Sequence, residues 1–308
     1  MDDTFAVRTC TAATEAIKYH HEWAVSEHWD PGPDGGLDFK YAFHPSYPEG
    51  FFVGAIQEED KEQVVSCICA MKYNDIGYIS FYIVGDPRRR KKGYGIRTFQ
   101  HAINQLSSCS WIGLCAKAAE VEIYKRLGFV VQAPVVRYSG DRITADTNAT
   151  TVDLASVPIE QLVHVDQRYT GTYRPDLITH WVRYHTTQKD CYGVAIIEEG
   201  QTVAFACMRR FVSGTYVIAP IYADTSDLAY DLVAKLTSVV DGGNVQFAAD
   251  AYMGNPGAED LFFQKLGWKL MQDTPLMYIM WRKGPAISMD APEKDSSGCF
   301  AIISPGMG

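Results

Sequence analysis

The chain has 308 residues, of which 47% are hydrophobic, and its formal net charge at pH 7 is −9. This length is enough for one to three domains, most simply two, with sizeable cores. The acidic balance disfavours extensive binding to nucleic acid. No apolar run approaches the roughly 18 residues of a membrane span, and the first residues lack the pattern of a secretory signal. The sequence therefore predicts a soluble, cytoplasmic protein.

Cysteines and histidines give no indication of a metal site. The eight cysteines are scattered and none forms a Cys-x-x-Cys pair, so they are expected to be buried free thiols in a reducing compartment. The eight histidines include no His-x-x-x-His spacing, and the adjacent His20 and His21 would point apart on a helix. We therefore expect no bound metal.

The first half of the chain alternates apolar runs with turn residues, which is typical of a sheet with flanking helices. A helix is predicted over residues 14–26, where Ala16, Ile17, Trp23 and Ala24 recur at roughly helical spacing. Further helices are predicted at residues 97–106 and 116–127, and strands at residues 5–10, 51–57, 64–73, 76–84, 111–115 and 129–136.

Residues 137–152 are polar and poor in apolar side chains, so the domain boundary is expected there. Beyond it, helices are predicted at residues 157–183, 226–240 and 258–266, and strands at residues 192–198, 202–211, 215–221, 245–249 and 268–281. The expected division is a first domain at 1–140, a linker at 141–154, a second domain at 155–283 and a disordered tail at 284–308.

The two halves of the chain repeat one another. Residues 51–73 correspond to residues 191–211, and residues 122–132 correspond to residues 261–272. This repetition favours duplication of one fold. The alternative is that two unrelated α+β domains share common patterns by chance.

The most informative stretch is the basic, glycine-containing turn DPRRRKKGYGI at residues 86–96. It follows an apolar run at residues 78–84 and precedes the predicted helix at residues 97–106. Glycines let successive N–H groups converge, and a helix N-terminus adds partial positive charge, so the turn is suited to bind phosphate. Neither a dinucleotide fingerprint nor a Walker loop is present. A nuclear-localisation or nucleic-acid patch is the alternative, which the acidic chain disfavours.

The turn contains an R-x-x-G-x-G motif at residues 90–95, with Pro87 three positions earlier, and a Y-x-x-x-G-F motif follows at residues 124–129. In this order, after a predicted strand, the motifs resemble those of the GNAT superfamily of N-acetyltransferases. The resemblance covers residues 5–140 and extends weakly, through the repeat, to residues 155–283. It implies an α+β fold of two GNAT-like domains, each with a central, mostly antiparallel twisted sheet flanked by helices.

The resemblance also implies a site for acetyl-CoA, the cosubstrate, in the first half. Backbone N–H groups of the turn would hold the pyrophosphate, and the pantetheine arm would pair with the preceding strand. The implied cofactor contacts are Ile83, Val84, Gly85, Arg90, Lys91, Lys92, Gly93, Tyr94, Gly95 and Ile96.

By the same resemblance, Tyr124 would protonate the departing thiolate of CoA. The alternative is that Tyr124 only packs in the core or against the cofactor. The equivalent position in the second half is Phe263, which lacks the hydroxyl, and the equivalent turn near Asp224 has no glycine and two carboxylates. We therefore expect one cofactor per chain, in the first half.

No general base is evident, because residues 78–84 contain no acid. Glu120 and Glu122 lie near Tyr124 in the sequence but are more simply solvated helix charges, and Cys115 is more simply a small buried residue. The loop before the central sheet supplies candidate acceptor contacts, with ordinary loop residues as the alternative. These candidates are His28, Trp29, Asp30 and Asp38.

The leading hypothesis is an acetyl-CoA-dependent N-acetyltransferase that transfers the acetyl group directly to an amine. The acceptor would be an amine-bearing small molecule, a lysine side chain or an N-terminal amine, with no nucleic-acid or membrane partner. The second domain would shape the acceptor cleft or support the fold. The competing hypothesis is a non-catalytic acyl-CoA-binding or regulatory module, which the missing base favours and Tyr124 opposes. The sequence does not identify the acceptor or the oligomeric state.

Overall fold

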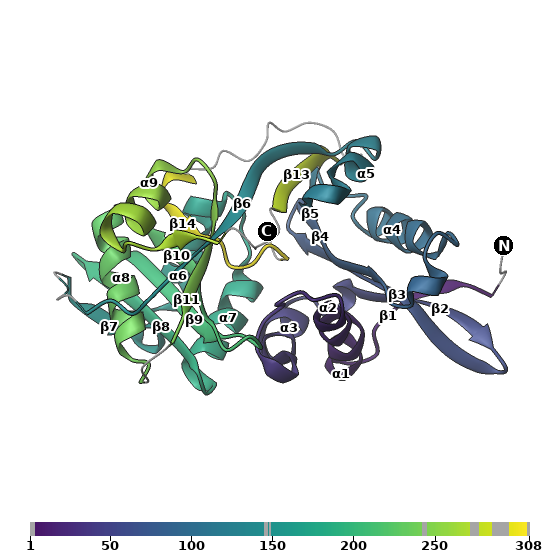
Figure 1. The fold of residues 1–308 in the computed structure, drawn as a ribbon, viewed down its shortest axis with the longest axis horizontal. Coiled ribbons are helices and arrows are strands. Elements are labelled where there is room, and N and C mark those ends of the chain that lie inside the picture. The colour runs from purple at the N-terminus through teal and green to yellow at the C-terminus, as the bar shows by residue number, and fades with distance from the viewer. Residues whose placement is uncertain are drawn as a thin grey trace.

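The fold is built on one large, mostly antiparallel sheet with helices on both faces (Figure 1). The computed structural model describes residues 4–144, 147, 149–241, 245–271, 277–284 and 296–306. Its strands are β1 (Ala6–Thr9), β2 (Phe51–Glu58), β3 (Lys61–Tyr73), β4 (Ile76–Val84), β5 (Trp111–Lys117), β6 (Val130–Gly140), β7 (Thr151–Asp153), β8 (Cys191–Glu198), β9 (Gln201–Arg210), β10 (Tyr216–Ala223), β11 (Phe247–Tyr252), β12 (Lys269–Leu270), β13 (Met277–Lys283) and β14 (Cys299–Ala301).

The described helices are short in the first half and longer in the second. They are α1 (Ala13–Ala16), α2 (Glu22–Ser26), α3 (His44–Ser46), α4 (Tyr94–Gln105), α5 (Val121–Arg126), α6 (Ile159–Thr170), α7 (Pro175–Thr187), α8 (Ser226–Ser238) and α9 (Pro256–Glu259). The single helix predicted over residues 157–183 is in fact α6 and α7. Gly171, with a φ of 69° in the left-handed region, ends α6 and lets the chain turn.

Within the described residues, the sheet order is β1-β2-β3-β4-β5-β13-β6-β11-β10-β9-β8-β7, with β12 beside β6 and β14 beside β10. Strands β4 and β5 pair in parallel, and so do β10 and β11 at the corresponding place in the second half. The predicted mixed fold, with a mostly antiparallel sheet and flanking helices, is confirmed.

The two halves exchange strands at the centre of the sheet. Strand β13 lies between β5 and β6, and all seven of its residues pair with β5, from Met277 opposite Lys117 to Lys283 opposite Trp111. Strand β6 pairs with β13 along its first part and with β11 from Val135 to Gly140. Each half therefore completes its sheet with a strand of the other, across the boundary expected at residue 140. The division into two domains stays a prediction.

The structure corrects two expectations at the ends of the second half. The linker expected at residues 141–154 ends in β7, which pairs with β8, and Leu154 is buried. The tail expected to be disordered at residues 284–308 contains β14, which pairs with β10. Residues 299–303 (CFAII) are all buried, because five consecutive weakly polar or apolar side chains gain more from the core than from water. Residues 285–295 and 307–308 of that tail lie outside the described residues.

In the first half of the chain, different hydrophobic clusters lie on the two faces of the sheet. Helices α4 and α5 lie on one face and α1, α2 and α3 on the other (Figure 1). Helix α4 turns Phe99, Ala102 and Ile103 toward the sheet at helical spacing, and their burial holds it there. The opposite face joins the second half, where the ring of Phe43 stacks on Trp181 with centroids 5.4 Å apart. No helix in the described ranges is long and apolar enough to cross a membrane.

Candidate active site

The two parallel strands of the first half separate part-way along their length. Strands β4 and β5 pair through four positions, which end at Ile79 opposite Leu114. Beyond them β4 continues to Val84 and β5 to Lys117 without further described pairing between the two strands. A register shift against β3 and a φ of 47° at Phe81 put a bulge in β4 just past this point. An extended, amide-bearing ligand could pair with β4 where the two strands diverge.

Helix α4 begins at the end of this divergence and presents its N-terminus. Gly93 is the N-cap residue with a φ of 89°, which explains a glycine there, and no described side chain caps the helix. The first N–H groups of a helix have no partner within the helix, so those of Gly95 and Ile96 are available to an anion. A Cβ at Gly95 would lie 2.4 Å from the hydroxyl oxygen of Tyr82, so a larger residue there would have to displace the Tyr82 side chain.

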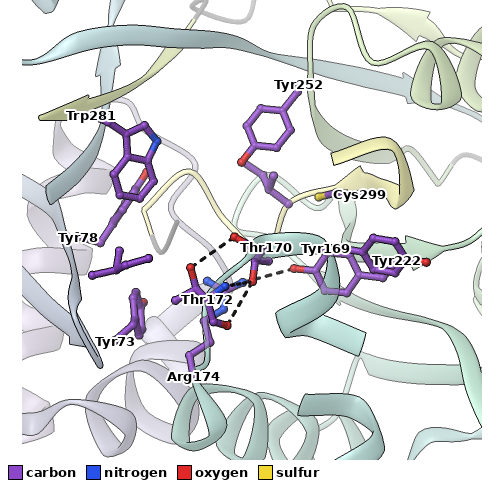
Figure 2. Close-up of a pocket in the computed structure, with 12 residues that line it drawn as sticks. Tyr73, Tyr78, Tyr169, Thr170, Thr172, Arg174, Tyr222, Tyr252, Trp281 and Cys299 are labelled. Atoms are coloured by element: carbon purple, nitrogen blue, oxygen red, sulfur yellow. Dashed lines mark hydrogen bonds between the residues drawn. The ribbon is translucent and has the colours of Figure 1, made fainter. Parts of the chain in front are cut away.

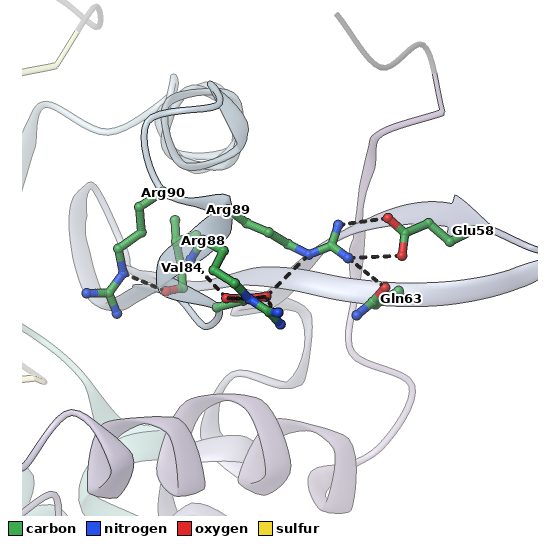
Figure 3. A network of polar contacts seen from close by, with 7 residues as sticks. Glu58, Gln63, Val84, Arg88, Arg89 and Arg90 are labelled. Atoms are coloured by element: carbon green, nitrogen blue, oxygen red, sulfur yellow. Dashed lines mark hydrogen bonds and ion pairs between the residues drawn. The ribbon is translucent and has the colours of Figure 1, made fainter.

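The arginines of the basic turn are engaged with protein groups (Figure 3). Arg89 donates to both carboxylate oxygens of Glu58, at 3.0 and 2.9 Å, and Arg88 pairs with Asp86 at 3.0 Å. Arg90 donates to the Val84 carbonyl at 3.2 Å and pairs with Glu27. These contacts fix the turn against β2 and β4.

The two lysines of the turn carry positive charges that are not paired with any described carboxylate. Lys91 and Lys92 are exposed, and neither forms an ion pair with any described residue. The two lysines and the α4 N-terminus are therefore the groups of the turn that could bind a phosphate. Arg90 instead stabilises the turn through its contacts with the protein.

Tyr124 of α5 lies beside the divergence on the α4 face. Its side chain is 9% exposed, and its ring packs 5.8 Å from Phe99 and 6.1 Å from Phe129. Burial, with smaller contributions from Glu120, Tyr82 of β4 and Cys115 of β5, raises the pKa of Tyr124 well above its usual value. The hydroxyl is therefore protonated at neutral pH, and no described group forms a hydrogen bond with it.

The neighbouring candidates differ in what they can do. Burial raises the pKa of the Cys115 thiol, so it is not a thiolate at neutral pH and gives no nucleophile. Glu122 pairs with Lys125 at 2.7 Å on the exposed side of α5. Glu120 is exposed by surface area, but partial desolvation still raises its pKa.

Two of the predicted acceptor contacts have unsatisfied polar atoms, Trp29 on the opposite face of β4 and Asp30 beside Ser213 and Arg137. The Trp29 ring lies 6.5 Å from that of Phe81, and Lys117 Nζ sits 4.7 Å over it. Trp29 Nε1 is buried without a hydrogen-bond partner in the described structure. Asp30 Oδ2 accepts from Ser213 Oγ at 2.8 Å, whereas its Oδ1 is likewise buried and unpartnered there. Such atoms are expected to face a ligand or water.

The other two predicted acceptor contacts do not join this group. His28 is exposed, with a φ of 59°, where the chain turns after α2. Asp38 is 0% exposed and forms an ion pair with Arg209, with Oδ2 3.5 Å from Nε. Asp38 is therefore paired within the protein, and its role as an acceptor contact stays a prediction. No pattern in the sequence indicated that Asp38 would be buried between two core segments.

A small cavity lies between the halves, and no sequence pattern indicated it (Figure 2). It has room for about one water molecule, 20 Å³. Arg174 lines it, but Asp166 accepts from Arg174 Nε and Nη2 at 2.8 and 2.9 Å, so the charge is already neutralised. The remaining lining is mostly aromatic, with Tyr73, Tyr78, Tyr169, Tyr222, Tyr252 and Trp281. No group of three His, Cys, Asp or Glu side chains able to hold a metal occurs among the described residues.

Comparison with known proteins relates the second half to a described family. Residues 162–290 match the family model of the acetyltransferase (GNAT) domain. This part of the chain, in the second half, is similar to a GNAT acetyltransferase domain. It is the half whose turn near Asp224 has no glycine and whose position 263 is a phenylalanine. GNAT proteins are acyltransferases that use acyl-CoA cosubstrates.

Two curated proteins are similar to this chain in sequence. It is 27% identical over 242 residues, 78% of this chain and 77% of the other, to the holothin acyltransferase of Pseudoalteromonas sp. (strain SANK 73390). It is 23% identical over 182 residues, 58% of this chain and 62% of the other, to the uncharacterised N-acetyltransferase YitH of Bacillus subtilis.

Solved structures show the same fold at low sequence identity. A Pyrococcus horikoshii protein provisionally described as an acetyltransferase superposes with a TM-score of 0.77 and 16% identity, covering 99% of this chain and 96% of the other. A tandem GNAT protein from the clavulanic acid biosynthesis pathway superposes with a TM-score of 0.59 and 12% identity, covering 92% of this chain and all (100%) of the other.

Proposed function

We propose that this protein is an acetyl-CoA-dependent N-acetyltransferase with one cofactor site, located where β4 and β5 diverge. The observation that carries the proposal is the combination found along this divergence. An uncapped helix N-terminus at Gly93 lies at its end, and the unpartnered, protonated hydroxyl of Tyr124 lies beside it. The pyrophosphate would sit at the α4 N-terminus, with Lys91 and Lys92 nearby, and the pantetheine arm would extend along β4 toward Tyr124.

Direct transfer follows from this placement. The amine nitrogen attacks the thioester carbonyl carbon, the new C–N bond forms, and the C–S bond breaks. Tyr124 donates its proton to the departing sulfur, and burial keeps this hydroxyl protonated until then. The proton that the amine loses would pass to water, because β4 has no carboxylate to accept it.

The acceptor would approach from the face of β4 on which Trp29 lies. The acceptor would lose its ammonium proton to water and react as the neutral amine. The buried, unpartnered Asp30 Oδ1 would accept a hydrogen bond from an N–H of this amine, and Trp29 Nε1 would donate to a polar atom of the acceptor. An amine-bearing small molecule, a lysine side chain and an N-terminal amine all present such a group. The relative named holothin acyltransferase is, by its name, an acyltransferase, which supports acyl transfer as the reaction.

The experiment is a comparison of Tyr124→Phe with Tyr278→Phe, which removes a hydroxyl from a residue packed against the same core cluster. Thiol release from acetyl-CoA would be followed with a panel of small amines, amino acids, polyamines and lysine peptides, and acetyl-CoA affinity by calorimetry. Loss of the general acid is expected to lower kcat by roughly 10²–10⁴-fold with unchanged affinity, whereas Tyr278→Phe retains activity. Equal activity of the two variants would mean that the assigned acid is wrong. Binding of acetyl-CoA without transfer to any amine would favour a non-catalytic acyl-CoA-binding module.

A further inference from the structure

The C-terminal strand occupies, in the second half, the place proposed for the pantetheine arm in the first. Strands β10 and β11 pair in parallel at only two positions, Tyr216 opposite Phe247 and Val217 opposite Ala248. Beyond them β14 pairs with β10, with Ala301 opposite Ile221. The next residue, Ile302, donates its N–H to the Asp250 carbonyl of β11 at 2.9 Å. The divergence of the second half is therefore filled by the protein's own chain.

This segment is held firmly in the second half. Residues 299–303 are each at most 2% exposed. Asn255 Nδ2 donates to the Cys299 carbonyl at 3.0 Å, and a Cβ at Gly298 would lie 2.0 Å from the Tyr169 ring. A cofactor arm could enter there only by displacing a buried strand, which agrees with a single cofactor site per chain.

From this anchor the chain runs to the first half. The hydroxyl of Tyr78 in β4 donates to the Pro305 carbonyl at 3.0 Å. Gly306 lies against the Phe81 ring, so close that a Cβ would be 2.8 Å from a ring carbon. Phe81 is the bulge residue of β4, and Figure 1 shows the C-terminal end of the chain in the space between β4 and the second half.

The face of β4 that the segment touches is the acceptor face of the proposed reaction. Tyr78 and Phe81 belong to the core cluster on the side of α1 to α3, and Trp29 packs against the same cluster. Ile79 and Tyr82 belong to the cluster on the side of α4 and Tyr124. A cofactor bound at the α4 N-terminus leaves the first of these faces for the amine.

We infer that residues 304–306 form one wall of the acceptor site in the first half, held in place by β14 in the unused slot of the second half. The inference rests on the proposed function. With Trp29 and Phe81 as the other walls and Asp30 nearby, the site fits a slender primary amine better than a bulky one. The wall also limits access of water to the thioester.

The test compares the full chain with a variant that ends after Ile303, which keeps β14 and the buried residues. A variant that ends after Gly306 is the matched control, because it keeps the wall. Acetyl-CoA affinity and thermal stability are expected to be the same in all three proteins. The variant ending at Ile303 is expected to hydrolyse acetyl-CoA at least fivefold faster, and its rate with benzylamine relative to propylamine should rise at least fivefold.

Unchanged hydrolysis and unchanged amine preference in the variant ending at Ile303 would overturn the inference alone, provided that acetyl-CoA binds. Failure of the full chain to bind acetyl-CoA would instead overturn the proposed function, and the inference with it. Tyr78→Phe is a second variant, which removes only the hydrogen bond to Pro305 and should change hydrolysis and amine preference in the same direction by a smaller factor.

Discussion

Asp38 and Arg209 form an ion pair that is buried on all sides between the two halves. Their side chains are 0% and 1% exposed, and Asp38 Oδ2 lies 3.5 Å from Arg209 Nε. The Arg209 guanidinium also stacks over the rings of Trp181 and Phe211, at 4.5 and 4.8 Å. The pair thus connects the loop before the first sheet to β9 of the second half.

Removing one partner of this pair should strongly destabilise the protein. Arg209→Met leaves the Asp38 carboxylate buried and uncompensated, which typically costs about 3–5 kcal/mol of unfolding free energy. The double variant Asp38→Asn, Arg209→Met leaves no buried charge and should lose clearly less. Urea denaturation of the three proteins at pH 7 measures both effects. A single variant as stable as the original protein would show that the pair contributes nothing.

His20 should make stability depend on pH. Its ring nitrogens Nδ1 and Nε2 lie 3.1 and 3.2 Å from the carbonyls of Ala16 and Ile68, and burial lowers its pKa to about 4. Because this value is below that of the unfolded chain, about 6.5, the contribution of His20 to stability is complete above pH 6.5. It is lost progressively as the pH falls toward 4.

Two measurements check this expectation. An NMR titration should show that His20 stays neutral down to about pH 4. The stability difference between the original protein and His20→Phe, which does not titrate, should shrink between pH 6.5 and pH 4. An imidazole that titrates near 6.5 would contradict the expectation.

The exchanged strand predicts that the first half does not fold alone. A chain of residues 1–140 lacks β13, so β5 and the first part of β6 would lose the strand between them. Unpaired strand edges are prone to aggregate. Circular dichroism and gel filtration should show an unfolded or aggregated fragment, and co-expression with residues 141–308 should restore a soluble complex. A stable, monomeric fragment with native-like strand content would refute this expectation.

Features set by neighbouring residues were predictable from the sequence. The strands at β2, β3 and β4 follow from apolar runs separated by charged turns, and the start of α4 follows from the glycines of the basic turn. The repeat predicts that the two halves share one fold, and in the structure each half contains one parallel strand pair.

Features that depend on distant residues were not predictable. Strand β13 pairs with β5, 160 or more positions earlier in the chain, and no local pattern specifies that partner. The polar residues 284–298 predict a disordered tail, although residues 299–303 are suited to a core. The pairing of Arg89 with Glu58, and of Arg90 with Glu27, likewise depends on how the turn packs against other elements. The motifs identified Gly93 and Tyr124 as candidate site residues, but they did not predict which side chains surround these two residues.

The most direct test of the central claim is calorimetric titration of acetyl-CoA into the full chain and into Gly93→Asp and Gly93→Asn. Both substitutions tolerate a left-handed φ and find no atom within 4 Å of the new Cβ, but only aspartate places a negative charge at the α4 N-terminus. The account predicts one site per chain in the original protein, retained binding in Gly93→Asn and at least tenfold weaker binding in Gly93→Asp. Two sites per chain, or equal affinity in the two variants, would contradict it.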